Sequence, residues 1–145
     1  MRTLGVDLGK RRIGLAVSDA TGLVARPLKT IERGASDQQA VELLRSTIES
    51  CNAEFGADDA IARIIIGLPT RLDGSPTEQT AHVRKIAAML TEAAGVPVQL
   101  QDERLSSREA EAHLSLKEKD WRKRKAKLDA VAAAVILQDY LDGHR

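Results

Sequence analysis

The sequence predicts one α/β domain built on a mixed five-stranded sheet, with three antiparallel strands, then a parallel βαβα half, and helices on both faces. Three extended stretches occur early, at residues 3–7, 12–18 and about 23–31, and short turns join them. Strand-like and helix-like segments then alternate, as is typical of parallel sheets. The 145 residues have the size of one domain with one core, and we expect residues 1–145 to form it.

The three early stretches are expected to pair in an antiparallel manner, because their connections are too short for a crossover. The first two flank a tight turn with the sequence GKRR. Pro27 interrupts the third stretch and has no amide hydrogen to donate to a neighbouring strand. The third strand is therefore expected at an edge of the sheet.

Helix-start signals and an apolar run mark the next elements. Ser36 followed by Gln39 is a capping-box pattern that predicts a helix over about residues 37–54. The β-branched run IARIIIGL, at residues 61–68, predicts a buried strand.

A second helix is expected to begin with Ser75 as its cap and Pro76 as its first residue. It should end near Ala94, because Gly95 follows and suits a helix C-terminus. Residues 97–101, PVQLQ, predict a short last strand.

Two further helices are expected in the last third of the chain, over about residues 107–115 and 127–141. Between them, residues 117–127 (KEKDWRKRKAK) hold seven Lys/Arg and two Asp/Glu. This composition predicts a mobile loop or a frayed helix. Trp121 either anchors the run to the core or touches a base, and anchoring is the interpretation we prefer.

Composition limits the possible functions. A single cysteine excludes an internal disulfide framework and a cysteine-based zinc site. Aromatic residues make up only 2%, so nucleic acid would be bound mainly through its phosphates rather than by stacking a run of bases. Neither a signal peptide nor a membrane-spanning run is recognisable, and we expect a cytoplasmic protein without membrane contact.

Acidic residues stand at the ends of predicted elements. Asp7 ends the first strand, Asp102 and Glu103 follow the last strand, and Asp129 is expected in the first turn of the final helix. Singly, each has another interpretation: Asp7 as a turn residue, Glu103 as a partner of Arg104, and Asp129 as a favourable charge at a helix N-terminus. Brought together, they would form an all-oxygen site that suits Mg²⁺ or Mn²⁺.

Four segments in order resemble the YqgF/RuvX family. They are GVDLGKRRIGLAVSD at 5–19, IIIGLPTRLDGS at 64–75, DERLSS at 102–107 and LDAVAAAVILQDYL at 128–141. Members of this family are Holliday junction resolvase-like proteins described as pre-16S rRNA nucleases. The resemblance implies an RNase H-like fold and a metal-dependent endonuclease, a hydrolase of phosphodiester bonds that processes the 5′ end of pre-16S rRNA.

The resemblance also assigns roles to particular residues. It implies that Asp7, Glu103 and Asp129 are the catalytic residues and the metal ligands, and that they hold two Mg²⁺ or Mn²⁺ ions. Such a pair of ions can bind both the attacking water and the leaving oxygen of a phosphodiester. Gly67 and Pro69 are implied to shape a loop near the site.

Basic residues lie beside the acidic positions and ahead of the final helix. Residues 70–72 (TRL) depart from the small or Asn-containing loop associated with the family, which leaves substrate preference open. The turn at residues 10–12 is either solvated or placed to contact a scissile phosphate, and we favour the contact. The full set of expected nucleic-acid contacts is Lys10, Arg11, Arg12, Arg71, Arg104, Arg122, Lys123, Arg124 and Lys125.

Other functions remain open at this point. The chain resembles the first phosphate loop of actin-like ATPases and sugar kinases at residues 7–9, but that arrangement needs two domains and this length holds one. A Holliday junction resolvase acting on branched DNA would use the same carboxylates. A transcription or ribosome factor with vestigial nuclease activity is a third possibility. We expect RNA, specifically pre-rRNA in a ribosomal context, as the partner, and a monomer or weak homodimer.

Overall fold

The computed structural model describes residues 1–71, 73–102 and 121–144, and the side chains of 121–126 are outside the description. The predicted helix at 107–115 lies outside the described residues. The strands are β1 (Arg2–Leu8), β2 (Arg12–Ser18), β3 (Ala25–Glu32), β4 (Ile61–Leu68) and β5 (Val98–Asp102), and the helices are α1 (Asp37–Phe55), the short 3-10 helix η1 (Ala57–Asp59), α2 (Glu78–Ala94) and α4 (Trp121–Gly143).

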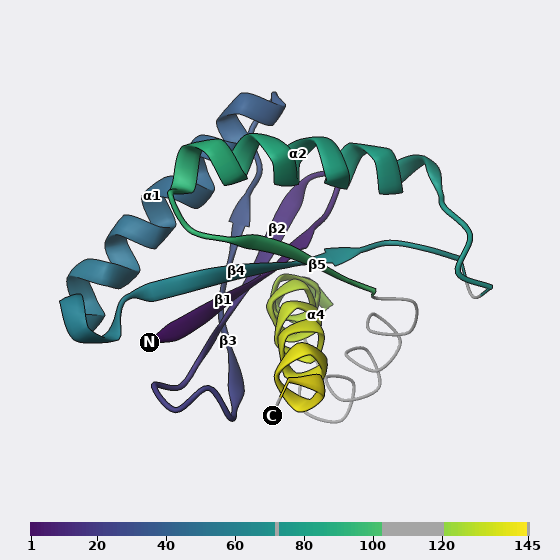
Figure 1. The fold of residues 1–145 in the computed structure, drawn as a ribbon. Helices are drawn as coiled ribbons and strands as arrows, with labels where there is room; N and C mark the ends of the chain where they lie inside the picture. The colour runs from purple at the N-terminus through teal and green to yellow at the C-terminus, as the bar shows by residue number, and fades with distance from the viewer. Residues whose placement is uncertain (72, 103–120, 145) are drawn as a thin grey trace.

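One sheet contains all five strands in the order β3-β2-β1-β4-β5 (Figure 1). The pairs β1–β2 and β2–β3 are antiparallel, whereas β1–β4 and β4–β5 are parallel. The predicted mixed sheet is therefore confirmed. Pro27 lies in β3 at the edge of the sheet, as expected, and the β2–β3 register shifts beside its partner Ala16.

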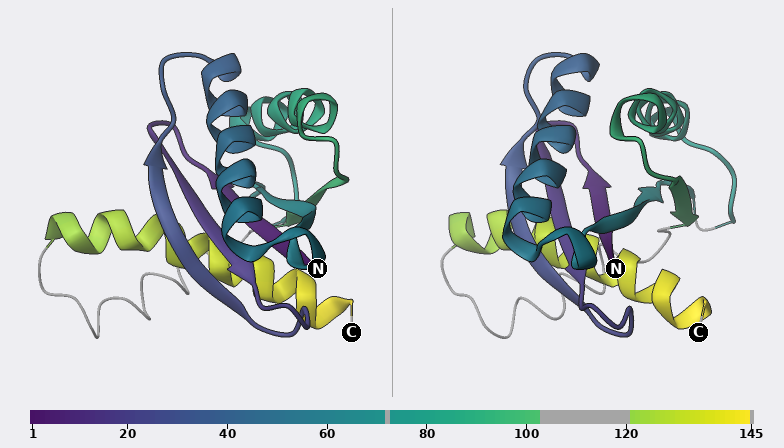
Figure 2. Two further views of the ribbon diagram at one scale, coloured as in Figure 1. Left: turned by 90° about the vertical axis from the view of Figure 1, so that its left-hand side faces the viewer. Right: turned by 60° about the vertical axis from the view of Figure 1, so that its left-hand side comes forward.

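The two faces of the sheet carry different helices. In Figure 2, α1 and α2 lie on one face and α4 crosses the other. Alternate residues of β1 explain this arrangement: Leu4, Val6 and Leu8 point into the core under α1 and α2, while Gly5 and Asp7 point toward α4. Helices on both faces were predicted and are confirmed.

Small residues let α4 approach the sheet closely. Four of the buried side chains in the described part of α4 are alanine, and its Ile136 and Leu137 belong to a second apolar cluster. A Cβ atom added to Gly5 would lie 2.8 Å from Cβ of Leu137, and one added to Gly14 would lie 1.8 Å from the main-chain oxygen of Asp129. Both distances are too short for a real side chain, so the position of α4 depends on these two glycines.

Helix α1 agrees with its prediction, because Oγ of Ser36 accepts a hydrogen bond from the amide of Gln39 at 3.1 Å. Helix α2 does not. Its N-cap is Thr77, with Thr80 completing the capping box, so the helix begins at Glu78. The predicted cap, Ser75, instead donates its hydroxyl to the carboxylate of Asp73 within the preceding loop.

Helix α4 is longer than predicted. It begins at Trp121 rather than near residue 127, so residues 121–127 are helical, while 117–120 lie outside the described residues. Arg, Lys and Ala have high helix propensity, which favours a helix in spite of the charged composition on which the prediction rested. The first part of α4 extends beyond the edge strand β3 in Figure 2. Asp129 is consequently well inside the helix, not in its first turn, and its interpretation as an N-terminal helix charge is wrong.

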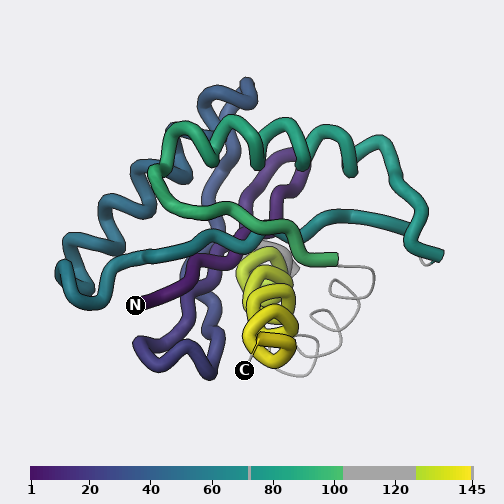
Figure 3. The backbone as a smooth tube through the Cα atoms, viewed as in Figure 1, coloured from purple at the N-terminus to yellow at the C-terminus, as the bar shows by residue number. Residues whose placement is uncertain are grey.

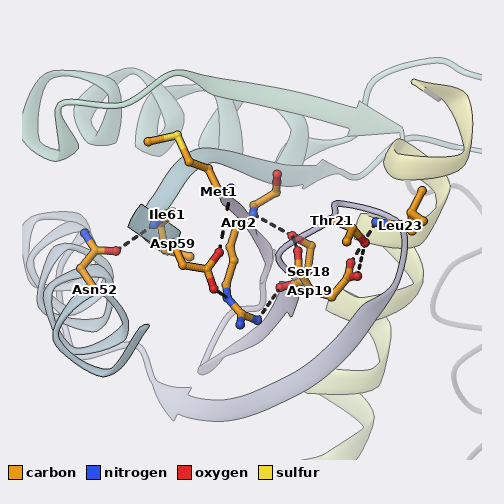
Figure 4. A network of polar contacts seen from close by, with 10 residues as sticks. Met1, Arg2, Ser18, Asp19, Thr21, Leu23, Asn52, Asp59 and Ile61 are labelled. Atoms are coloured by element: carbon orange, nitrogen blue, oxygen red, sulfur yellow. Dashed lines mark hydrogen bonds and ion pairs between the residues drawn. The ribbon is translucent and has the colours of Figure 1, made fainter. Parts of the chain in front are cut away.

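A polar network secures the chain start (Figure 4). Nε of Arg2 donates to Asp59 at 2.7 Å, and its Nη1 donates to the carbonyl of Ser18 at 3.1 Å. The Arg2 guanidinium also lies over the Phe55 ring, 4.1 Å from its centroid. These contacts join β1 to the ends of β2 and α1. None of the helices in the described part of the chain is long and apolar enough to cross a membrane.

Candidate active site

Asp7 is the only acidic residue of β1 and lies one residue before the strand ends. Its partner across the β1–β2 pair is Gly14. On the other side, Gly67 follows Ile66, which pairs with Val6. Glycines thus occupy the neighbouring positions on both adjacent strands, and Asp7 itself is half-buried.

Asp129 lies against the same part of the sheet. The main-chain oxygen of Asp129 is 1.8 Å from the point where Gly14 would carry a Cβ atom, so α4 crosses β2 directly over Gly14. Directly opposed residues of an antiparallel pair place their Cβ atoms on one face, about 4.5–5.5 Å apart. Asp7 and Asp129 are therefore brought to one place on the α4 face, although 122 positions separate them in sequence. This proximity was implied by the family resemblance and not by spacing.

Arg12 links the basic turn to this site. It stands two residues before Gly14 in β2 and so lies on the same face. Its Nε donates to Oδ2 of Asp129 at 2.7 Å, and both side chains are about one-third exposed, at 33% and 27%. The sequence placed Arg12 among phosphate contacts, but in the structure it also holds an acidic residue of the site.

The end of β5 supplies a further carboxylate. Asp102 is the last residue of β5, and its Oδ1 accepts a hydrogen bond from Oγ1 of Thr70 at 2.9 Å. This contact ties β5 to the loop between β4 and α2, which extends beyond the sheet before returning to α2 (Figure 3). Glu103 follows Asp102 in sequence but lies outside the described residues, as does Arg104.

Within residues 1–71, 73–102 and 121–144, no group of three or more Asp, Glu, His or Cys side chains is arranged to hold a metal ion. The predicted trio includes Glu103, so this observation concerns only two of its members. Those two, Asp7 and Asp129, offer oxygen donors alone, which is the chemistry that Mg²⁺ and Mn²⁺ prefer.

The predicted basic contacts are distributed around this end of the sheet. Lys10 and Arg11 are exposed in the β1–β2 turn, and Gly9 is needed there because its Cβ would lie 2.7 Å from the carbonyl oxygen of Arg12. Arg71 is exposed in the loop after β4, where its amide donates to Ser75. The side chains of Arg122, Lys123, Arg124 and Lys125 are outside the description, although their backbone is helical.

Sequence reasoning missed a second polar cluster behind the β1–β2 turn. Arg33 is only 8% exposed. Its Nη2 lies 2.5 Å from Oδ1 of Asp37 and 2.8 Å from Nε2 of His82, while its amide donates to the carbonyl of Arg11. Arg33 follows an edge strand directly, and only its tertiary contacts distinguish it from an exposed arginine.

Asp37 is the acid of this cluster. Partial burial would raise the pKa of its carboxyl, but Lys85, His82 and Arg33 outweigh that effect and hold the pKa below its usual value. Nζ of Lys85 lies 3.3 Å from Oδ2 of Asp37, and Nε2 of His82 lies 3.2 Å from Oδ1. The cluster therefore joins β3, α1 and α2 behind the turn that follows Asp7.

Solved structures define the class of fold. RuvC from Thermus thermophilus aligns over 99% of this chain and 96% of its own, with a TM-score of 0.53 and 17% identity. The fowlpox virus Holliday junction resolvase aligns over 100% of both chains, with a TM-score of 0.55 and 12% identity. At these identities the likeness shows the fold alone, and the fold is RNase H-like, as the sequence predicted.

Sequence comparison gives the family. The chain belongs to the RuvX family, whose sequence profile, described as Holliday junction resolvase, matches residues 1–143. A relative from Anaeromyxobacter sp. (strain K), named "Putative pre-16S rRNA nuclease", is 44% identical over 98% of this chain and 97% of its own length. A relative of the same name from Geobacillus kaustophilus is 41% identical over 100% of both chains. The resemblance found in the four segments is thereby confirmed.

Proposed function

We propose that this protein is a metal-dependent endonuclease that trims the 5′ end of pre-16S rRNA during ribosome assembly in the cytoplasm. The observation that carries the proposal is that Gly14 pairs with Asp7 in the sheet while the main chain of Asp129 crosses directly over it. Membership of a nuclease family and relatives named for pre-16S rRNA support the choice of reaction and substrate.

Asp7, Asp129 and Glu103 would hold the metal. The first two carboxylates come from a rigid strand and a helix packed against it, and Glu103 directly follows the last residue of β5. A bound pair of Mg²⁺ or Mn²⁺ ions supplies an activated water and stabilises the leaving oxygen of a phosphodiester. The chain positions the three ligands and neutralises the substrate near them.

Arg12 has two tasks in this scheme. Its ion pair orients the Asp129 side chain, and its remaining guanidinium donors are available to a phosphate oxygen at the site. Lys10 and Arg11 in the adjoining turn contribute positive charge where the backbone of the bound strand would pass. Replacing Arg12 by Gln should therefore weaken both RNA binding and turnover, while a single ion pair that is still reached by solvent contributes only about 1 kcal/mol to stability.

Carboxylate variants test the site. Asp7→Asn, Glu103→Gln and Asp129→Asn each keep the side-chain shape and remove a ligand charge. Each should lower the cleavage rate by on the order of 10–100-fold or more, with the fold intact by circular dichroism. Asp139→Asn is the matched control, since this residue is exposed on the same helix as Asp129. Near-normal cleavage in any of the three variants would remove that residue from the site.

Metal dependence is tested separately. Cleavage should require Mg²⁺ or Mn²⁺ and stop in excess chelator, and Ca²⁺ should support little turnover because its coordination is looser. Direct binding of Mn²⁺ to the wild type, and its loss in Asp7→Asn, provides a readout that does not depend on turnover. Full cleavage in excess chelator would refute metal-dependent hydrolysis.

Holliday junction cleavage is the second candidate, because the family profile carries that description. A resolvase must cut two strands symmetrically, which normally requires a two-fold dimer. Cells depleted of this protein should accumulate 16S precursor with an unprocessed 5′ end, and the purified protein should cut that end in ribosomal particles. Normal rRNA ends together with paired nicks in a synthetic four-way junction, and a dimer by solution mass, would favour the resolvase.

A further inference from the structure

A cavity of about 510 Å³ lies behind the β1–β2 turn, on the face of the sheet opposite α4. Its walls come from the turn itself, from the segment between β3 and α1, and from the first turns of α2. This volume falls within the roughly 300–1,000 Å³ typical of ligand sites. The lining includes Leu8, Lys10, Arg33, Glu78, Gln79 and His82.

The cavity is adjacent to the candidate active site. Leu8 follows Asp7 directly, and because residues alternate along a strand, Asp7 faces α4 while Leu8 faces the cavity side. Only the tight turn at residues 9–11 separates the two. A nucleic-acid strand with its scissile phosphate at Asp7 can therefore pass over Lys10 and place a neighbouring nucleotide in the cavity.

The charges of the walls favour a neutral group over a phosphate. Lys10 and Arg33 are cationic, whereas Asp37 and Glu78 are anionic, and Arg33 is already paired with Asp37. The charges of these four lining side chains cancel, so they do not by themselves select a phosphate. Leu8 supplies apolar surface, and the Gln79 amide supplies both a donor and an acceptor. This mixture of apolar surface and hydrogen-bonding groups suits a nucleobase, which has apolar faces and a polar edge.

Aromatic residues make up only 2% of this chain, and the lining of the cavity offers planar side chains of another kind. The His82 ring is 41% exposed and lines the cavity, and the Arg33 guanidinium lies 2.8 Å from its Nε2. An imidazole plane can serve as a stacking surface for an unpaired base, and Arg33 holds this ring from behind. Contacts of Arg33 with Asp37 and with the carbonyl of Arg11 fix this pair in place without a ligand.

We infer that this cavity binds the base of an unpaired nucleotide next to the cleaved phosphodiester, with the base on His82 and its edge against Gln79. The inference rests on the proposed nuclease function, because the strand is led to the cavity by the site at Asp7. The inference requires a substrate that is unpaired next to the cleaved bond. A continuous duplex could meet this requirement only if one base were flipped out of the stack.

The test uses the full chain and short single-stranded RNA oligonucleotides that span the 16S precursor 5′ end, in Ca²⁺ to limit cleavage. An abasic nucleotide is placed at each position in turn. One position beside the cut should lower the affinity of the wild type by roughly 5–100-fold, the effect of losing one stacked base. His82→Ala should lower the affinity for the intact RNA by a similar factor and abolish the effect of the abasic position.

The abasic RNA and His82→Ala together form a double-perturbation cycle, and two further variants accompany it. His144→Ala removes an exposed histidine from the C-terminal end of α4 and should leave the abasic effect unchanged. Ala35 is an exposed residue that lines the cavity, so Ala35→Leu should narrow the cavity. This variant should lower the affinity for intact RNA as His82→Ala does, although His82 is unchanged. Thermal melts check that each variant is folded.

Two results would overturn the inference. The first is an equal RNA affinity at every abasic position. The second is that the affinity losses from His82→Ala and from the abasic position are independent, so that their factors multiply when the two are combined. Absence of any RNA binding would refute both the cavity and the proposed function. Coupling between His82 and the abasic position, without cleavage of the precursor in Mg²⁺, would refute only the proposed reaction. Cleavage without this coupling would refute only the base site.

Discussion

Replacing Gly14 by Ala should separate α4 from the sheet at the point where Asp7 and Asp129 meet. The backbone of Gly14 is not in the left-handed region, so alanine suits its conformation. Its space is the difficulty, since the new Cβ would lie 1.8 Å from the main-chain oxygen of Asp129 and real Cβ contacts under 3.0 Å essentially never occur. The obstacle is helix backbone, which cannot rotate away as a side chain can.

The magnitude follows from the displacement. Reaching 3.0 Å from 1.8 Å requires a relative movement of roughly 1.2 Å. Overpacking of this kind costs about 1–3 kcal/mol, which lowers Tm by roughly 2–12 °C for a domain of this size. A misplacement of about 1 Å between catalytic groups can cost on the order of 100-fold in rate. We therefore expect a folded, less stable protein with about 1% of the wild-type cleavage rate.

Alanine substitutions at two other glycines, Gly5 and Gly143, should have smaller effects and serve as comparisons. A Cβ at Gly5 would lie 2.8 Å from a side-chain carbon of Leu137, which makes Gly5→Ala milder in both stability and rate. At Gly143, on the same helix, nothing lies within 4 Å of an added Cβ, so Gly143→Ala should cost neither. Thermal denaturation and RNA cleavage are measured on all three variants. Wild-type Tm and wild-type cleavage for Gly14→Ala would refute the placement of α4 over β2.

Three further perturbations concern the hairpin tip, the chain start and the basic helix end. The hydroxyl of Thr21 and neighbouring main-chain amides lower the pKa of Asp19, so its stabilising effect is present above about pH 4 and is lost as the pH falls further. In urea unfolding, the difference in unfolding free energy between wild type and Asp19→Asn should therefore shrink from pH 7 to pH 3. A difference that stays constant over this range would contradict the expectation. Asp59→Asn weakens the partner of Arg2 and should cost about 1–3 kcal/mol by the same unfolding assay, whereas an unchanged midpoint would show that the pair contributes nothing. The last variant replaces four basic residues at the start of α4: Arg122→Gln, Lys123→Gln, Arg124→Gln and Lys125→Gln. The slope of log RNA affinity against log salt concentration should become less steep by roughly 0.7–0.9 for each phosphate contact that is lost. An unchanged slope would mean that these side chains are only solvated.

Local sequence signals determined most of the secondary structure and the class of the sheet. The predicted strands at 12–18 and 61–68 have the bounds that the structure shows, and the proline of β3 correctly marked an edge. These features depend on side-chain alternation and on amide donors, which are properties of neighbouring residues. The start of α2 was misplaced because a second capping box, formed by Thr77 and Thr80, caps the helix, while the Ser75 hydroxyl donates to Asp73 in the preceding loop.

The candidate site shows where local information ends. The sequence supplied Asp7 and Asp129 through a family resemblance, but each alone had an ordinary alternative, and the alternative for Asp129 required a helix start that the structure does not have. Their proximity depends on the antiparallel register that opposes Asp7 to Gly14 and on the absence of a side chain at Gly14. A glycine in a strand does not reveal from sequence which helix will cross it.

Arg33 gives the clearest contrast. In sequence it is one more basic residue after an exposed strand, and composition indicates only that such residues are usually solvated. In the tertiary structure it is buried because Asp37, His82 and the carbonyl of Arg11 meet it from three different elements. The sequence thus determined the elements, their order and the carboxylates available for chemistry. The register and helix packing decided which of those groups lie together, because contacts between distant residues exist only once the chain has folded.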